Sequence, residues 1–238
     1  MFNFSPTQYD VNFKIFNFQV RIHPFFWVLS MLLFMHVQID SLRLWILNMA
    51  VCVCAIFISV LVHELGHAFV FRHIFSVESD IMLHGMGGVT IPLRPLRRYY
   101  GAKGMLCKVF LSAAGCLAGF VLAAGAYGLL MTINVQQNGF GLLNIVQNFL
   151  SWTMIISIVW GIFNLLPIYP LDGGQIFREI FLFFSPRKGL ANSLVISMVT
   201  AGICVALCVS YQRFFIALLA GFLAYQNYLE LTRQSFRY

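Results

Sequence analysis

The stretch ISVLVHELGHAFVF, residues 58–71, places His63, Glu64 and His67 inside a long run of apolar residues. An ionisable side chain at the centre of a membrane-spanning helix is expensive, at about 3 kcal/mol on insertion scales. Histidines four residues apart project from one face of a helix, and Glu64 lies beside them at the same level. The stretch therefore predicts a membrane-spanning helix that carries a polar functional site.

The composition of the whole chain supports a membrane location. The 238 residues are 60% hydrophobic and only 10% charged, whereas a soluble domain carries roughly 25% charged residues. A soluble protein of this length would lack the charges needed to cover its surface. The sequence therefore predicts an integral membrane protein.

Six apolar runs predict an all-α polytopic fold with about six membrane-spanning helices. They cover residues 24–37, 44–71, 108–133, 142–166, 190–210 and 214–231. Residues 1–23 alternate between apolar and polar side chains, which indicates an interfacial segment or a short strand. Residues 72–107 form a cytoplasmic loop whose centre, SDIMLHGMGGVTIPL, predicts a hairpin or re-entrant β element. We expect residues 1–238 to form a single membrane-embedded domain, with a short amphipathic helix after the fourth span.

The net charge of +7 suggests topology rather than nucleic-acid binding. On the six-span topology, thirteen of the fifteen lysines and arginines fall on one side of the membrane. Cytoplasmic loops carry such an excess of cations. The chain is therefore expected to keep both termini in the cytoplasm and to bind no nucleic acid.

The letters HELGH, residues 63–67, match a zinc-hydrolase motif. In this motif two histidines ligate zinc, and the glutamate takes a proton from water at the metal. A third ligand is needed, and of the eight acidic residues only Asp172 lies in a Pro- and Gly-flanked break beside a span, NLLPIYPLDGGQ. Broken backbone at membrane depth is tolerated where it lines a cavity. The alternative for Asp172 is an ordinary polar turn.

Three stretches together resemble the site-2 protease family of intramembrane zinc metalloproteases: HELGH (63–67), SAAGCLAGF (112–120) and NLLPIYPLDGG (164–174). The resemblance implies that His63, His67 and Asp172 bind one zinc ion per chain and that Glu64 is the general base. It also implies that Asn164 positions the scissile peptide or its oxyanion. The chain departs from the family at Cys116 and Gly119, where the pattern usually has Pro and Asn.

The stretch GMGGVT, residues 85–90, resembles the re-entrant β element of the family. The resemblance implies that Gly87, Gly88 and Val89 bind the substrate by pairing with its unwound backbone. The expected activity is endopeptidase cleavage of a transmembrane segment in a membrane-protein substrate, as in regulated intramembrane proteolysis. The expected location is a bacterial inner membrane.

The sequence shows no PDZ or CBS module, so substrate selection is expected to depend on the membrane domain, its loops or a regulatory membrane partner. Three alternatives stay open at this point. The first is a zinc transporter or sensor, although four of the predicted spans carry almost no charge. The second is an inactive protein of the same fold, and the third is a prenyl-protein protease, which takes a glutamate from a later helix as its third ligand.

Overall fold

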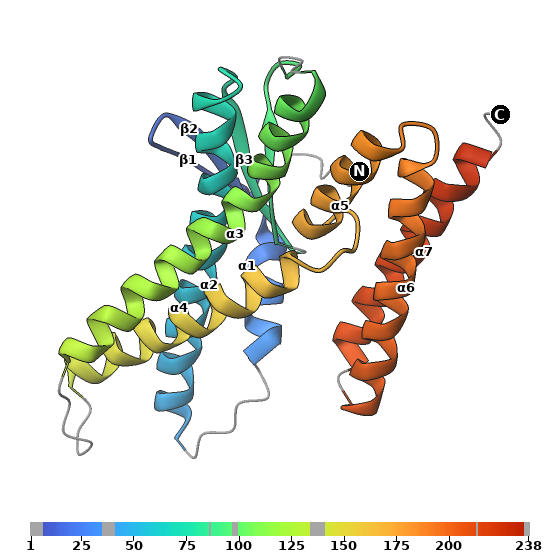
Figure 1. Ribbon diagram of the computed structural model, residues 1–238. Coiled ribbons are helices and arrows are strands. Elements are labelled where there is room, and N and C mark those ends of the chain that lie inside the picture. Colours follow the sequence, from blue (N-terminus) through green and yellow to red (C-terminus); the bar gives the residue numbers. More distant parts are fainter. Residues whose placement is uncertain are drawn as a thin grey trace. The chain divides into compact units, whose positions relative to one another are not determined.

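The computed structural model describes residues 7–34, 41–85, 87–96, 100–133, 141–212 and 214–235. Figure 1 labels its helices and strands, and the chain divides into two compact units. The first comprises Met1–Arg97 and Ala114–Gly161, and the second Arg98–Ala113 and Ile162–Tyr238. Helices α3 (Gly101–Thr132) and α4 (Leu142–Asn164) contribute residues to both units.

The first unit contains a four-stranded sheet in the order β1-β2-β3-β4. The strands are β1 (Val11–Ile15), β2 (Phe18–Ile22), β3 (Ser79–His84) and β4 (Gly87–Pro92). The β1–β2 and β3–β4 pairs are antiparallel, and β2 pairs with β3 in parallel, with Val20 opposite Ile81. The predicted β element at β3–β4 is thus part of a larger sheet.

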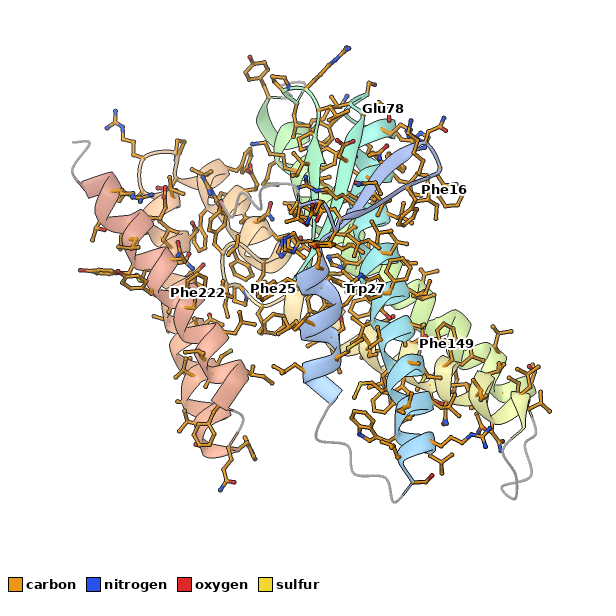
Figure 2. The ribbon with its side chains drawn as sticks, turned by 180° about the vertical axis from the view of Figure 1, so that it is seen from behind. Phe16, Phe25, Trp27, Glu78, Phe149 and Phe222 are labelled. Carbon is orange, nitrogen blue, oxygen red and sulfur yellow. The ribbon has the colours of Figure 1, made fainter. Side chains whose placement is uncertain are left out.

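The described part of the N-terminal segment forms two strands joined by a tight turn. Phe16 and Asn17 connect β1 to β2 with positive φ angles of 49° and 66°, as both central residues of a two-residue type I′ turn require. The side chain of Arg72 donates a hydrogen bond to the carbonyl oxygen of Phe16 at 2.8 Å and pairs with Glu78 at 3.0 Å. Figure 2 shows Phe16 and Glu78 at the same end of the sheet.

Strand β2 supplies one side of the hydrophobic core of the first unit. Its side chains alternate, so that Phe18, Val20 and Ile22 are at most 2% exposed. They share a core cluster with Val60 and Leu65 of α2 (Leu42–His73). The period-2 pattern of this segment therefore reflects a half-buried strand packed near the helix that carries HELGH.

Helix α1 (Pro24–Phe34) begins at a proline, whose fixed φ suits the first position of a helix. The ring of Trp27 lies 5.7 Å from that of Phe57 on α2, and Phe26 is 3% exposed. Figure 2 labels Trp27 where α1 meets α2. Over its 11 residues α1 is about 16 Å long, shorter than the roughly 30 Å hydrocarbon core of a bilayer.

Four of the described helices are long and apolar enough to cross a membrane: α2, α3, α4 and α6 (Gly189–Ser210). The protein is an integral membrane protein, as its composition predicts. The predicted count of six spans is not confirmed: the described part of α1 has 11 residues, and α7 (Phe214–Ser235) is not among these four helices. Residues 35–37 of the first predicted span lie outside the described residues.

In the second unit α6 and α7 pack side by side (Figure 1). Helix α5 (Asp172–Phe184) is the short helix expected after the fourth span. Lys108, near the start of α3, pairs with Glu179 of α5 at 2.9 Å. The loop expected over 72–107 is shorter than predicted, because α2 continues to His73 and α3 begins at Gly101.

Candidate active site

His63 and His67 form the centre of the candidate site in the first unit. Both lie on α2 and are buried, with 3% and 9% of their surfaces exposed. Their Nε2 atoms are 3.3 Å apart, and the ring planes are almost perpendicular at 82°. The four-residue spacing predicted this shared face, and the helix geometry provides it.

The separation of the two nitrogens suits a tetrahedral metal ion. Zinc binds imidazole nitrogen at about 2.0–2.1 Å, so two ligands at the tetrahedral angle lie about 3.3–3.4 Å apart. The Nε2 atoms of His63 and His67 already have this separation. The donor pair therefore fits zinc without rearrangement of the helix.

Helix α3 leaves room for the two imidazoles at Gly115. A Cβ atom added there would lie 2.8 Å from Nε2 of His63 and still closer to Nε2 of His67. A second close contact involves the neighbouring residue on each helix, where a Cβ at Gly66 would meet the carbonyl oxygen of Ala114 at 2.5 Å. Small residues let α2 and α3 approach closely, which explains the glycine and alanines of SAAGCLAGF.

Glu64 lies against strand β4. The hydroxyl of Thr90 is 2.8 Å from Oε2 of Glu64 and 3.1 Å from its main-chain oxygen, so it can donate to the carboxylate. A Cβ atom at Gly88 would lie 2.5 Å from Oε1. Glu64 itself is 3% exposed. Strand β4 thus holds the carboxylate in two ways. Thr90 supplies a hydroxyl donor, and Gly88 leaves space because it has no side chain.

The three predicted substrate-binding residues take different places on β4. Gly88 faces Glu64, together with Thr90 two residues on, and Val89 points to the opposite face of the strand. Gly87 has a φ of +120°, and a Cβ there would lie 2.7 Å from the ring of Trp160 on α4. All three residues lie on β4, which is the last strand in the order of the sheet.

Sequence reasoning missed Thr90 and the role of Gly115. The signal for Thr90 was present, because residues two apart on a strand share a face and Thr90 follows Gly88 by two. The role of Gly115 depends on which residues of α3 face α2. That depends on the packing of two helices far apart in the sequence.

The second unit holds Asn164 and Asp172. Asn164 is the last residue of α4 and is 8% exposed, and Asp172 is the first residue of α5 and is 6% exposed. The chain between them folds tightly on the start of α5, since a Cβ at Gly173 would lie 2.5 Å from the carbonyl oxygen of Leu166. This close approach explains the Gly-Gly pair of the sequence PLDGG.

His84 is the last residue of β3, opposite Gly87 of β4. Burial lowers the pKa of His84 below its ordinary value of 6.5, and the charge of His23 adds to the effect. His23 precedes α1, and its main-chain N–H donates to the carbonyl oxygen of Leu83 at 2.8 Å. The two histidines therefore belong to the junction of β3 and α1.

The chain is similar in sequence to members of one protease family and in fold to one solved structure. The model of peptidase family M50 matches residues 132–209. The chain thus resembles this family, the site-2 protease family. A zinc metalloprotease of Methanocaldococcus jannaschii is 26% identical over 186 residues, which are 78% of this chain and 48% of that protein. Stage IV sporulation protein FB of Bacillus subtilis is 28% identical over 169 residues, which are 71% of this chain and 49% of that protein.

The fold of a solved site-2 protease from M. jannaschii is similar to that of this chain. The TM-score is 0.60 at 23% sequence identity, and the match covers 94% of this chain and 95% of the other. The predicted resemblance to the site-2 protease family is therefore confirmed. The chain spans about half the length of the curated relatives that it matches.

Proposed function

We propose that this chain is a zinc endopeptidase that cleaves a transmembrane segment of a membrane-protein substrate. The observation that carries the proposal is the buried set of His63, Glu64 and His67. The imidazole nitrogens have the separation of zinc ligands, and a hydroxyl donor holds the carboxylate beside them. A buried set of this kind in an apolar helix is expensive unless it has a function.

His63 and His67 would hold one zinc ion per chain, with Asp172 as the third ligand. Support for Asp172 comes from its place in PLDGG, which resembles the family motif, and from its burial at the start of α5. Two imidazoles and one carboxylate form a common ligand set of catalytic zinc, which leaves one position open. When bound, zinc polarises a carbonyl group and lowers the pKa of water to about 7.

Glu64 is the proposed general base. Its carboxylate takes a proton from the water that attacks the scissile carbonyl carbon, and a C–O bond forms. The C–N bond then breaks, and Glu64 returns the proton to the leaving amine. Thr90 keeps the carboxylate in one orientation, and the Asn164 side-chain amide would donate a hydrogen bond to the developing oxyanion.

Strand β4 is the proposed binding site for the substrate backbone. A transmembrane helix exposes no scissile carbonyl until its main-chain hydrogen bonds open, and a strand edge can replace those bonds. Gly87, Gly88 and Val89 lie on the terminal strand of the sheet. Pairing along this strand would bring the opened peptide past Glu64, which contacts the same strand.

The proposed setting is a lipid bilayer, with a bacterial inner membrane as the expected one and both termini in the cytoplasm. The support for this orientation is the cation distribution of the sequence. The proposed process is regulated intramembrane proteolysis, in which a membrane partner selects or presents the substrate.

The experiment that tests the proposal compares zinc content and proteolysis in purified wild type, Glu64→Gln and Asp172→Ala. We expect Glu64→Gln to retain zinc and lose cleavage of a transmembrane reporter, and Asp172→Ala to lose both. Glu78→Gln is a control, because that carboxylate is exposed and pairs with Arg72. Equal loss of zinc in Glu64→Gln and Asp172→Ala, or full cleavage by Glu64→Gln, would contradict the assignment.

A further inference from the structure

We propose that Ser197 of α6 and Asn227 of α7 are positioning residues that set the zinc affinity of the site. They hold the peptide group of Tyr169, three residues before Asp172. The inference rests on the proposed function, because it takes Asp172 as a zinc ligand. It adds a role for the last two helices of the chain.

The main chain of Tyr169 is held by two different helices. Its N–H donates to Oγ of Ser197 at 3.0 Å, and its carbonyl oxygen accepts from Nδ2 of Asn227 at 2.6 Å. Ser197 also donates to the carbonyl oxygen of Ser193 at 2.9 Å. The Ser197 hydroxyl therefore has one fixed direction, donating to its own helix and accepting from the loop.

Asn227 is 1% exposed, and its amide has one workable orientation. Nδ2 lies 2.6 Å from the Tyr169 oxygen and 2.7 Å from the Leu223 oxygen, so both of its hydrogens are used. Rotation of the amide by half a turn would place Oδ1 against two carbonyl oxygens. The side chain thus fixes the distance between α7 and the loop.

The neighbouring residue strengthens this attachment. Ile168 is 1% exposed and packs against Ala201 of α6 and Leu223 of α7. The N–H of Leu171 then donates to the Ile168 oxygen at 2.8 Å, which closes the loop immediately before Asp172. Displacement of Tyr169 would therefore move the start of α5.

A polar side chain that only joins two helices forms its hydrogen bond with a group on the facing helix. Ser197 and Asn227 instead direct their inter-segment hydrogen bonds to one peptide group of the loop. Groups that orient metal ligands from outside typically change metal affinity by about 10–100-fold when removed. The contacts of Tyr169 place Ser197 and Asn227 in that position for Asp172.

The test uses the full chain purified in detergent, with zinc affinity measured by competition with a chelator. Ser197→Val and Ser197→Thr form a matched pair, because valine and threonine have the same shape and only threonine carries a hydroxyl. We expect Ser197→Val and Asn227→Leu to bind zinc at least about tenfold more weakly than wild type, and Ser197→Thr to recover the affinity. Ser193→Ala is the control, since that hydroxyl donates to the carbonyl oxygen of Leu190 on its own helix.

Two further readouts separate positioning from general stability. The absorption bands of cobalt bound in place of zinc should shift in Ser197→Val and stay unchanged in Ser197→Thr, because they report ligand geometry. The thermal midpoint of the zinc-free protein, measured for each variant, shows whether weaker zinc binding merely follows lost stability. Equal zinc affinity in the pair, or affinity that only follows the zinc-free thermal midpoint, would overturn the proposal.

The outcomes also distinguish this proposal from the proposed function. Suppose that wild type binds zinc and that Asp172→Ala weakens the binding. If Ser197→Val then binds zinc as wild type does, only the positioning role fails. If wild type binds no zinc, or Asp172→Ala binds it as wild type does, the proposed function fails and this inference fails with it. If Asn227→Leu does not fold, the comparison of Ser197→Val with Ser197→Thr by itself tests the positioning role.

Discussion

Replacing Gly115 with alanine is expected to disturb the proposed metal site directly. The added methyl carbon would lie 2.8 Å from Nε2 of His63 and closer still to Nε2 of His67. Ordinary contacts of a Cβ atom begin near 3.4 Å, so the His63 ring would have to move by about 0.6 Å to reach ordinary contact distance. Metal–ligand distances tolerate only about 0.2 Å.

This overlap sets the size of the expected effect. Overpacking a filled site costs about 1–3 kcal/mol, and each 1.4 kcal/mol is tenfold in a binding constant. If the whole cost appears in metal binding, Gly115→Ala should bind zinc about 5–150-fold more weakly than wild type. Cleavage should fall with zinc occupancy and recover in part when excess zinc is added.

Competition between the protein and a chelating dye measures this affinity. The matched control is Gly125→Ala, on the same helix, where a Cβ would meet nothing within 4 Å. Gly125→Ala should bind zinc as wild type does, and α3 should gain a little stability from alanine. The same zinc affinity in Gly115→Ala and Gly125→Ala would refute the placement of α3 against the histidines.

Two more predictions follow from the first unit. Thr90→Val should lower the rate of the proposed cleavage about tenfold or more while zinc content stays unchanged, because a donor to Glu64 is lost. Thr90→Ser should retain most of the rate, and equal rates for the two variants would contradict the role of the hydroxyl. The pKa of His84 lies below 6.5 in the folded protein, so the unfolded chain binds more protons as the pH falls through 6.5 and the folded state loses stability there. Between about pH 7.5 and pH 5.5 the thermal midpoint of wild type should fall more than that of His84→Gln; parallel curves would show that His84 does not contribute.

The helical part of the site was predictable because its determinants are local. The spacing of His63 and His67 by itself fixes a shared helix face. Asp172 was singled out by the break around it, and the structure places it at the start of a short helix, buried and followed by two tightly packed glycines. Local sequence patterns and backbone restrictions sufficed for these features.

The sheet could not be predicted in full because its central pairing is not local. Alternation indicated a strand near Val20, but its partner Ile81 lies beyond two helices. The hydrogen bond from Thr90 to Glu64 depends on this pairing, since the sheet places β4 against α2. The count of six spans rested on apolar composition alone, and four of the described helices are long and apolar enough to cross a membrane.

The parallel pairing of β2 with β3 has a consequence for the biosynthesis of the chain. Val20 and Ile81 are 61 residues apart in the sequence, so at about 5–20 residues per second the ribosome needs about 3–12 s to deliver the second strand after the first. During that interval β1 and β2 stand as an isolated hairpin, which is marginally stable by itself. The helix that carries the histidines is synthesised in the same interval. The sheet that orients Glu64 is therefore completed only after α2 has left the ribosome.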